Sequence, residues 1–536
     1  MRTLHLGLKN NTIRRGDRWT SFYIMGTLFA TLLALPVIYV IIQAGGTEFT
    51  RWQRLWNVRI PSLLSNTLQL TLSVTLAAVL IGVSLAWLVE RVELPFRNFW
   101  RWALALPLLI PPYIGAVAYI IILGPKGWVA SLWESTIYQR LGWSYPLQIY
   151  SFWGIFFVLT LFTYPYVFII TSAAIRKISG HYDELARSHG YTTFQLFRHT
   201  HLPLLQPAIL AGAILISLYV LSDFGAVGML RYLTFTTAIY YQMGSYDQAS
   251  ATILSTFLIG LMWIILWLKV RLQRDHHVAQ QLHSFQPAVP LKISKVARAG
   301  SLFFISLLFM LAFLIPLVVF LYWSWQAFQL GNWDPRFWEY AWNSLQISLI
   351  AAILSVVIAL PIIYLKLRQP TRWSEWIYGL SYIGYSLPGI IVGLGLIFIF
   401  NRYIPWLYQT PFILIIAYTI RFIPQAMQGE EASLQLLSPR IEEAARSLGR
   451  KPLTTLFTVI VPAILPGILA GGALVFVSAL KELPATLLLR PPGFDTLAIR
   501  IWVETNEALY YLAAPAALFI ILISILPLRW LLSRST

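Results

Sequence analysis

The sequence predicts an all-α polytopic membrane protein, with about 12 transmembrane helices arranged as two parallel six-helix repeats. Three observations predict this fold class. Only 11% of the 536 residues are charged while 58% are hydrophobic, whereas about 25% of the residues in soluble domains are charged. Twelve apolar segments are long enough to be spans, since about 20 residues cross about 30 Å of hydrocarbon. The second half of the chain also repeats sequence motifs of the first half.

The apolar segments give the expected spans in order. They lie near residues 21–43, 64–89, 100–123, 150–174, 208–229, 251–270, 301–323, 345–365, 376–400, 411–422, 466–487 and 511–532. The segment 411–422 is short unless it continues past Arg421 toward Met427. The first segment follows a basic tail and is too long for a typical signal-peptide core, so we expect it to remain as a span.

The basic residues indicate the orientation of the chain. The formal net charge is +18, but the lysines and arginines lie in short loops at the ends of spans rather than in one patch. With the N-terminus inside, most of the 39 lysines and arginines fall on the cytoplasmic side, as the positive-inside rule requires. We therefore expect both termini to be cytoplasmic.

Matching motifs define the two repeats. "SNTLQLTL" at Ser65 corresponds to "WNSLQISL" at Trp342, a displacement of 277 residues, and "LIPPYIG" corresponds to "SLPGIIV" at the same displacement. The expected domains are a first transmembrane repeat (1–270), a cytoplasmic linker (271–298) and a second transmembrane repeat (299–536). An even number of spans in each half makes the repeats parallel, related by an axis along the membrane normal.

A polar insert occurs once in each repeat, on the expected cytoplasmic side. The copies are "YDELARSHGYTTFQLFRHTHLPLLQPA" and "IEEAARSLGRKPLTTLFTVIVPAILPG", displaced by 259 residues. In the second copy, Ser438 suits an N-cap, Pro439 the first helical position, and the two glutamates the positive end of the helix dipole. Ser179 occupies the corresponding N-cap place in the first copy.

The rest of the insert predicts a helix–turn–helix outside the membrane. One apolar stripe is expected on the first helix, formed by Ile441, Ala444 or Ala445, and Leu448. Gly449 suits a left-handed residue that ends this helix, and a second helix should run to Pro462. A single such helix is typical of a segment that rests on the lipid surface. Two copies on pseudo-symmetric halves instead favour a partner that is itself a symmetric dimer.

The inserts resemble the EAA loop of ATP-binding-cassette importer permeases, a cytoplasmic coupling helix that docks on the ATPase subunit. The resemblance assigns this coupling role to Glu184, Ala186, Gly190 and Pro203 in the first half and to Glu443, Ala445, Gly449 and Pro462 in the second. The first copy departs from the motif at Leu185, and it has His189 where the second copy has Leu448. We therefore expect unequal docking by the two loops.

Two further segments are similar to the ferric-iron importer permeases of bacteria, here as a fused, duplicated chain. They are "SDFGAVGMLRYLTFTTAIY" and "KELPATLLLRPPGFDTLAIRIW". The resemblance implies a bacterial inner-membrane subunit that works with two copies of an ATPase and a periplasmic iron-binding protein. Permeases for thiamine, phosphonate or another ion are the alternatives for the cargo.

No enzymatic activity is expected of this chain. It has no G-x-x-x-x-G-K-[ST] loop, so we expect no cofactor on this chain, and the resemblance places ATP and Mg on the partner subunits. It has no cysteine, and all eight histidines map to the cytoplasmic side, so no metal site is predicted. No nucleophile, base and orienting residue stand together in a recognisable motif, so no catalytic site is predicted either. A pathway without these ligands suits a hard cation better than zinc or copper.

Two carboxylates are candidates for the translocation path. Asp223 and Glu482 occupy equivalent positions, each 20 residues after the insert's proline. That distance is about 30 Å along a helix, which places them near the outer mouth. The alternative is that each anchors a loop through an ion pair with a nearby basic residue, and the candidates are Lys481, Arg231 and Arg490.

A secondary transporter with 12 spans is the rival fold-level interpretation. Such a protein is expected to place ionisable residues at mid-bilayer, where they are usually functional. The expected spans are nearly free of charge except at their ends. A secondary transporter also gives no reason for the paired polar inserts, so the importer interpretation is preferred.

Overall fold

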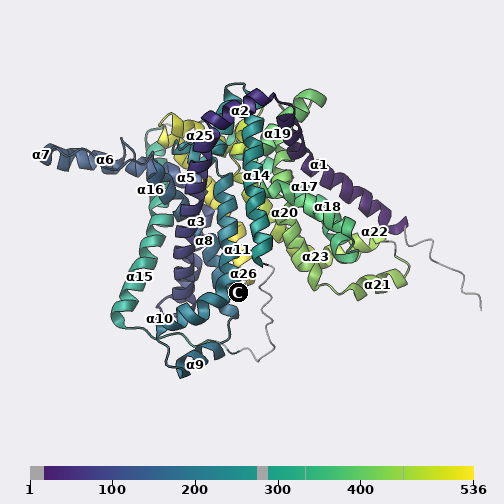
Figure 1. Cartoon of the computed structure of the whole chain (residues 1–536), viewed down its shortest axis with the longest axis horizontal. Coiled ribbons are helices and arrows are strands. Elements are labelled where there is room, and N and C mark those ends of the chain that lie inside the picture. The colour runs from purple at the N-terminus through teal and green to yellow at the C-terminus, as the bar shows by residue number, and fades with distance from the viewer. Residues whose placement is uncertain (1–16, 274–285, 287, 332, 451, 536) are drawn as a thin grey trace, which may run out of the picture. The chain divides into compact units, whose positions relative to one another are not determined.

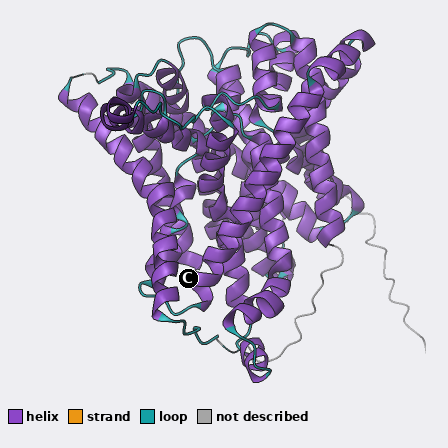
Figure 2. Cartoon of the chain, turned by 60° about the vertical axis from the view of Figure 1, so that its left-hand side comes forward, coloured by secondary structure: helices purple, strands orange, loops and turns teal. Residues whose placement is uncertain are grey.

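The computed structural model describes residues 17–273, 286, 288–331, 333–450 and 452–535. Helices make up most of this part of the chain (Figures 1 and 2). Among the described residues, ten helical segments are long and apolar enough to cross a membrane, and two shorter apolar helices, Gly389–Tyr403 and Tyr510–Ile525, lie where two further spans are expected. The all-helical fold class is confirmed.

The first half contains these elements: α1 (Asp17–Gly45), α2 (Phe49–Val58), α3 (Ile60–Arg91), α4 (Arg97–Ala103), η1 (Leu106–Leu109), α5 (Pro112–Leu123), α6 (Trp128–Trp133), η2 (Glu134–Tyr138), α7 (Gln139–Leu141), α8 (Phe152–Lys177), α9 (His181–Ser188), α10 (Thr193–Leu196), η3 (Phe197–His201), α11 (Leu202–Ser222), α12 (Gly225–Met229), α13 (Phe235–Gly244) and α14 (Gln248–Gln273). The second half contains these: α15 (Lys295–Phe309), η4 (Met310–Leu314), α16 (Ile315–Gln329), α17 (Phe337–Arg368), α18 (Arg372–Tyr382), η5 (Ile383–Ser386), α19 (Gly389–Tyr403), α20 (Pro411–Leu436), α21 (Pro439–Ser447), α22 (Pro452–Thr455), η6 (Leu456–Ile460), α23 (Val461–Leu480), α24 (Pro484–Leu489), α25 (Leu497–Asn506) and α26 (Tyr510–Ser535).

The described residues form two compact units whose bounds differ from those of the sequence repeats. The first-repeat unit comprises Val40–Ala341 and Asp495–Leu526, and the second-repeat unit comprises Trp342–Phe494 with the described residues before Val40 and after Leu526. Most of α1, the first helix in the described part of the chain, therefore packs with the second repeat. The boundaries expected at 270 and 299 therefore remain predictions about the sequence repeat, and they are distinct from the bounds of the compact units.

Contacts inside each unit hold the opening helix of each repeat in place. In the second-repeat unit, α1 lies so close to α19 that a Cβ on Gly395 would be 2.3 Å from the carbonyl oxygen of Pro36. In the first-repeat unit, the π-helical turn η4 before α16 receives a hydrogen bond from α5, from the Tyr119 hydroxyl to the Leu311 carbonyl oxygen at 2.7 Å. The opening helix of each repeat is thus built into the unit formed mainly by the other repeat.

The third expected span of each repeat is interrupted, which corrects the expectation of continuous helices at 100–123 and 376–400. The chain forms α4, the 3₁₀ turn η1 and then α5 in the first repeat, and α18, η5 and α19 in the second. Ile110 and Leu387 end the 3₁₀ turns with extended backbone, because the residue before a proline is disfavoured in the α region. Both are 1% exposed, and irregular backbone at membrane depth is tolerated where protein covers it.

The segment expected to be the weakest span is a long helix. α20 runs from Pro411 to Leu436 and so continues past Arg421 and Met427. It packs closely on α23 through small residues: a Cβ on Gly429 would lie 2.6 Å from the carbonyl oxygen of Gly467. Small residues at such contacts let helix backbones approach within a membrane.

Candidate functional site: the two polar inserts and the carboxylates beyond them

Each polar insert begins with a short helix. α21 starts at Pro439, as expected, and the Ser438 hydroxyl accepts the Arg440 backbone N–H at 3.4 Å. α9 starts at His181 with Gly180 at its N-cap, which corrects the expectation that Ser179 caps it. The Ser179 hydroxyl instead accepts the backbone N–H groups of His181 and Gln286.

The two motif glycines end these helices in the left-handed conformation, as the sequence predicts. Gly190 has a φ of +78° and Gly449 a φ of +80°. The next residue in each loop folds back: the Tyr191 N–H donates to the Ala186 carbonyl oxygen at 3.1 Å, and the Arg450 N–H donates to that of Ala445 at 3.2 Å. A Cβ at either glycine would meet no atom within 4 Å, so the glycines are needed for their backbone conformation rather than for space.

The expected apolar stripe does not face the chain. Ala445 is buried, but Ile441 is 43% exposed and Leu448 is 83% exposed. In the first copy Ala186 is buried while Leu185 is 45% exposed. Among these apolar positions, Ala186 and Ala445 rest against the rest of the protein, whereas the large side chains remain available to a partner.

The second insert helix is the beginning of the next span, which corrects the expectation of a separate helix ending at the proline. One continuous helical segment covers Thr193–Ser222 in the first half and Leu456–Leu480 in the second. A π-helical turn, η3 or η6, precedes Pro203 or Pro462 in these segments. The wider turn fits a proline, which has no backbone N–H to donate to the preceding turn.

The acidic residues of the motif are divided between the surface and the interior. Glu184 and Glu443, the residues assigned to coupling, are exposed. Their neighbours Asp183 and Glu442 are 5% and 3% exposed. Sequence reasoning did not separate these adjacent acids. The signal was present in the basic residues at the ends of α3 and α17, Arg91 and Arg368, which are displaced by 277 like the rest of that span.

The described part of the linker packs on the first insert. The Gly180 N–H donates to the Gln286 carbonyl oxygen at 2.8 Å, and Leu291 exchanges backbone hydrogen bonds with the end of α3, one of them to Arg91 at 2.7 Å. Leu291 also forms an apolar cluster with Ala186 and Leu196. The linker therefore covers the motif alanine of the first polar insert.

The two path candidates each begin a short helix at the far end of the span that follows the insert. The Asp223 carboxylate accepts the backbone N–H groups of Ala226 and Val227 at 3.0 and 3.1 Å at the start of α12. The Glu482 carboxylate accepts the Ala485 N–H at 3.1 Å at the start of α24. These short helices pack on α5 and α19, the second parts of the interrupted third spans. Discontinuous helices of this kind often form substrate sites in transporters.

The ionic environment of the two carboxylates differs. Glu482 forms an ion pair with Arg421 of α20, a partner that sequence reasoning missed although Arg421 is the lone charge inside an apolar run. The first half has no counterpart, since Phe162 occupies the position 259 residues earlier. Among the described residues Asp223 has backbone donors but no ion pair. Arg231, one of its expected partners, lies over the Tyr150 ring at 5.1 Å.

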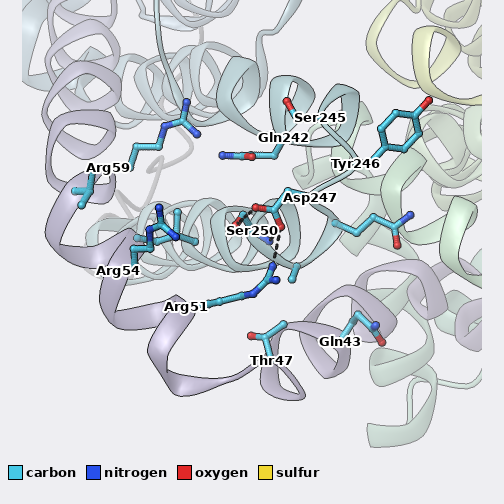
Figure 3. A pocket seen from close by; sticks show the side chains of 14 residues that line it. Gln43, Thr47, Arg51, Arg54, Arg59, Gln242, Ser245, Tyr246, Asp247 and Ser250 are labelled. Carbon is cyan, nitrogen blue, oxygen red and sulfur yellow. Dashed lines mark hydrogen bonds and ion pairs between the residues drawn. The ribbon is translucent and has the colours of Figure 1, made fainter.

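A basic pocket of about 800 Å³ lies between α2 and the turn that joins α13 to α14 (Figure 3). Arg51 pairs with Asp247 at 2.9 Å, and Arg54 and Arg59 also line the cavity. Partial burial raises the pKa of Asp247, but hydrogen bonds from Ser250 and the charge of Arg51 outweigh this and hold it below its ordinary value. Three guanidinium groups against one carboxylate make this pocket unsuitable for a metal cation.

Comparison with known proteins places these features in a family of transport proteins. A family model described as "Binding-protein-dependent transport system inner membrane component" matches residues 78–276 and 352–532. The chain is 33% identical over 523 residues to the Fe(3+)-transport system permease protein FbpB 2 of Haemophilus influenzae, which covers 96% of this chain and 98% of that protein.

The names of two other relatives state a different cargo. The thiamine transport system permease protein ThiP of Salmonella typhimurium is 23% identical over 489 residues, 89% of each chain. The sulfate transport system permease protein CysW of Escherichia coli strain K12 is 27% identical over 290 residues, which is 50% of this chain and 94% of that protein. The similarity to CysW thus covers about half of this chain.

Proposed function

Because the chain belongs to the binding-protein-dependent transport system inner membrane component family, we propose that it is the permease subunit of an ATP-driven importer whose cargo is ferric iron. Similarity over nearly the full length to a Fe(3+)-transport permease is the observation that carries this proposal. The multiple apolar helices agree with a multi-pass inner-membrane protein. Both termini are proposed to lie in the cytoplasm.

The coupling helices α9 and α21 supply the contact with the ATPase in this proposal. Each exposes a glutamate and large apolar side chains, while its alanine rests on the permease. One ATPase subunit binds at each helix, and ATP and Mg bind to those subunits. A periplasmic iron-binding protein delivers the cargo to the opposite side, and this chain itself performs no hydrolysis.

The chemistry of the candidate path supports a hard cation. Asp223 and Glu482 offer carboxylate oxygens, and the chain has no cysteine with which to favour a soft metal. Thiamine is the second candidate, because a thiamine permease matches 89% of the chain.

The deciding experiment is reconstitution of the purified chain in proteoliposomes with the ATPase and the solute-binding protein encoded beside it. We expect the ferric-loaded binding protein to stimulate ATP hydrolysis and to deliver radioactive iron into the vesicles. The empty binding protein and a thiamine-loaded thiamine-binding protein serve as controls. If only the thiamine-loaded binding protein stimulated ATP hydrolysis, the cargo would be reassigned to thiamine. If the chain retained no ATPase subunit, the importer proposal would be refuted.

A further inference from the structure

In the first-repeat unit, a buried arginine ties the coupling helix to the end of the second span. The Arg91 side chain, at the last residue of α3, donates to the Asp183 carboxylate of α9 at 2.9 Å. Its other terminal nitrogen donates to the carbonyl oxygens of Ile178 at 2.8 Å and Ile175 at 3.3 Å, at the end of α8. Arg91 is 1% exposed. One guanidinium thus joins the ends of two spans to the coupling helix.

The second-repeat unit contains the same arrangement. Arg368, the last residue of α17, donates from Nε to the Glu442 carboxylate of α21 at 2.5 Å. It also donates to the carbonyl oxygen of Leu437 at 3.1 Å, directly after α20. The Arg368 and Glu442 side chains are 10% and 3% exposed, so this pair too lies away from solvent.

The two arrangements use equivalent residues of the repeats. Arg91 and Arg368 differ by 277 residues, the displacement of the second spans, while Asp183 and Glu442 differ by 259, the displacement of the inserts. The accepting carbonyls of Ile178 and Leu437 also differ by 259. The same pair therefore occurs at equivalent positions of both repeats and does not depend on local features of one half.

The aromatic residue one turn before each arginine also reaches the buried carboxylate, through a histidine in the first half and directly in the second. In the first half Trp87 donates to His201 at 3.0 Å, and the other ring nitrogen of His201 contacts Asp183 at 2.7 Å. In the second half Tyr364, displaced by 277 from Trp87, donates directly to Glu442 at 3.0 Å. The longer glutamate side chain reaches the tyrosine without an intermediate histidine.

These contacts can pass a movement of α9 or α21 to the membrane spans. A buried carboxylate cannot bind an ATPase subunit, and a buried ion pair with additional directional hydrogen bonds holds one geometry, because breaking it leaves an uncompensated charge. Displacement of α9 or α21 by a partner must then displace the end of α3 or α17.

We propose that Arg91–Asp183 and Arg368–Glu442 are positioning pairs that transmit movement of each coupling helix to the second span of the same half. The inference rests on the proposed function, since it assigns the coupling helices to an ATPase. The exposed glutamates contact the partner, whereas the adjacent buried acids carry the movement into the membrane helices.

The test removes the charges without leaving one of them unpaired. In the double variant Arg368→Met with Glu442→Gln, the amide oxygen of the substituted side chain can still accept a hydrogen bond from the Tyr364 hydroxyl. The chain has no cysteine, so Leu448→Cys and Arg372→Cys place two spin labels near the free end of α21 and just beyond α17. The distance distribution between the labels is measured in the full chain, alongside iron delivered per ATP hydrolysed by the reconstituted complex.

We expect the double variant to broaden the distance distribution and to lower the iron delivered per ATP about tenfold, a typical size for coupling between sites. The matched control is Lys366→Met with Glu431→Gln. That pair, 2.6 Å apart, joins the same end of α17 to α20 rather than to the coupling helix. It should leave the distribution narrow. Arg368→Lys keeps the charge but cannot bond both acceptors, so an intermediate result is expected and supplies a milder variant.

Three outcomes overturn the proposal. They are a narrow distribution with unchanged iron per ATP in the double variant, equal broadening in the control, and normal coupling despite broadening. If the unaltered complex delivers no iron, the proposed function fails instead, and the distance measurement still decides whether the pair positions the helix.

Discussion

At the scale of single residues, the adjacent acids of each insert have different surroundings. Glu443 is exposed, while Glu442 is buried against Arg368 and Tyr364. One helical residue turns the side chain by about 100°, since 3.6 residues complete a turn. A motif of two acids therefore presents one to a partner and one to the interior.

Reversing the exposed charge tests the docking role. Glu443→Lys should leave the protein in the membrane but uncouple ATP hydrolysis from uptake, because it reverses the exposed charge that α21 presents to the partner. Glu184→Lys should have a smaller effect, since the exposed His189 replaces the apolar Leu448 in that copy. Uptake by the reconstituted complex measures both variants, and equal losses in the two halves would refute the asymmetry.

The glycine that ends each coupling helix is a second test. Gly449→Leu should strain the left-handed backbone by roughly 1–2 kcal/mol, without a clash, because the site is open. We expect retained expression and reduced coupling, with a milder effect of Gly190→Leu. The same uptake and ATPase assays apply, and full activity of Gly449→Leu would contradict the need for this turn.

The two path candidates should differ in their effect on stability. Glu482→Gln leaves Arg421, whose side chain is 13% exposed, without its partner, and breaking a buried pair costs about 3–5 kcal/mol. Asp223→Asn removes no ion pair in the described structure and should cost less. Thermal unfolding of the detergent-solubilised chain compares them, and Arg421→Met with Glu482→Gln is the control that should recover stability.

The same carboxylates are tested for a transport role by the double change Asp223→Asn with Glu482→Gln. If they belong to the ion's path, iron uptake falls while ATP hydrolysis stimulated by the loaded binding protein survives. Persistence of both activities would exclude the path role. Loss of assembly would favour loop anchoring, in agreement with the capping hydrogen bonds that both carboxylates accept.

At the scale of elements, the linker distinguishes the first coupling loop from the second. Leu291 is 2% exposed and packs on Ala186 and Leu196. Truncating a buried leucine to alanine costs about 2–5 kcal/mol of stability. Here the substitution weakens the contact between the linker and the first polar insert. The linker should therefore influence local opening of α9 more than global unfolding.

Leu291→Ala is expected to speed amide hydrogen exchange in residues 181–196 and leave residues 439–460 unchanged. The second loop serves as the internal control because it lies in the other compact unit. Leu291→Ile, which keeps the apolar volume, should behave nearly as the unaltered chain. Unchanged exchange in residues 181–196 after Leu291→Ala would show that the linker does not secure the first loop.

At the scale of the whole molecule, the apolar segments predict the number of spans, and the distribution of basic residues predicts the orientation. Within the described part of the chain, ten long helical segments and two shorter helices occupy the twelve expected places. Introduced cysteines can establish the orientation, since the chain has none of its own. Tyr246 is 91% exposed and Leu448 is 83% exposed, and they are expected on opposite sides.

Tyr246→Cys should react with an impermeant maleimide added to intact cells, whereas Leu448→Cys should react only after the inner membrane is permeabilised. The unaltered chain is the blank for both. Labelling of Leu448→Cys in intact cells would reverse the proposed orientation and remove the coupling helices from the cytoplasm.

The sequence by itself determined the class, the duplication and the two polar inserts with their glycine turns. Apolar length reports the spans directly because a bilayer has a fixed thickness, and the motif glycines report a left-handed turn because few other residues adopt it. Equivalent residues such as Asp223 and Glu482 follow from the constant displacement of the repeats alone.

Only the tertiary structure decided which residues meet. The break in each third span, the placement of α1 with the second repeat and the partners of Asp183, Glu442 and Glu482 all depend on contacts between segments far apart in the chain. Local periodicity gives the direction of a side chain on its own helix, but burial and pairing depend on the neighbouring helix. For that reason adjacent acids with the same local pattern have different surroundings in the folded protein.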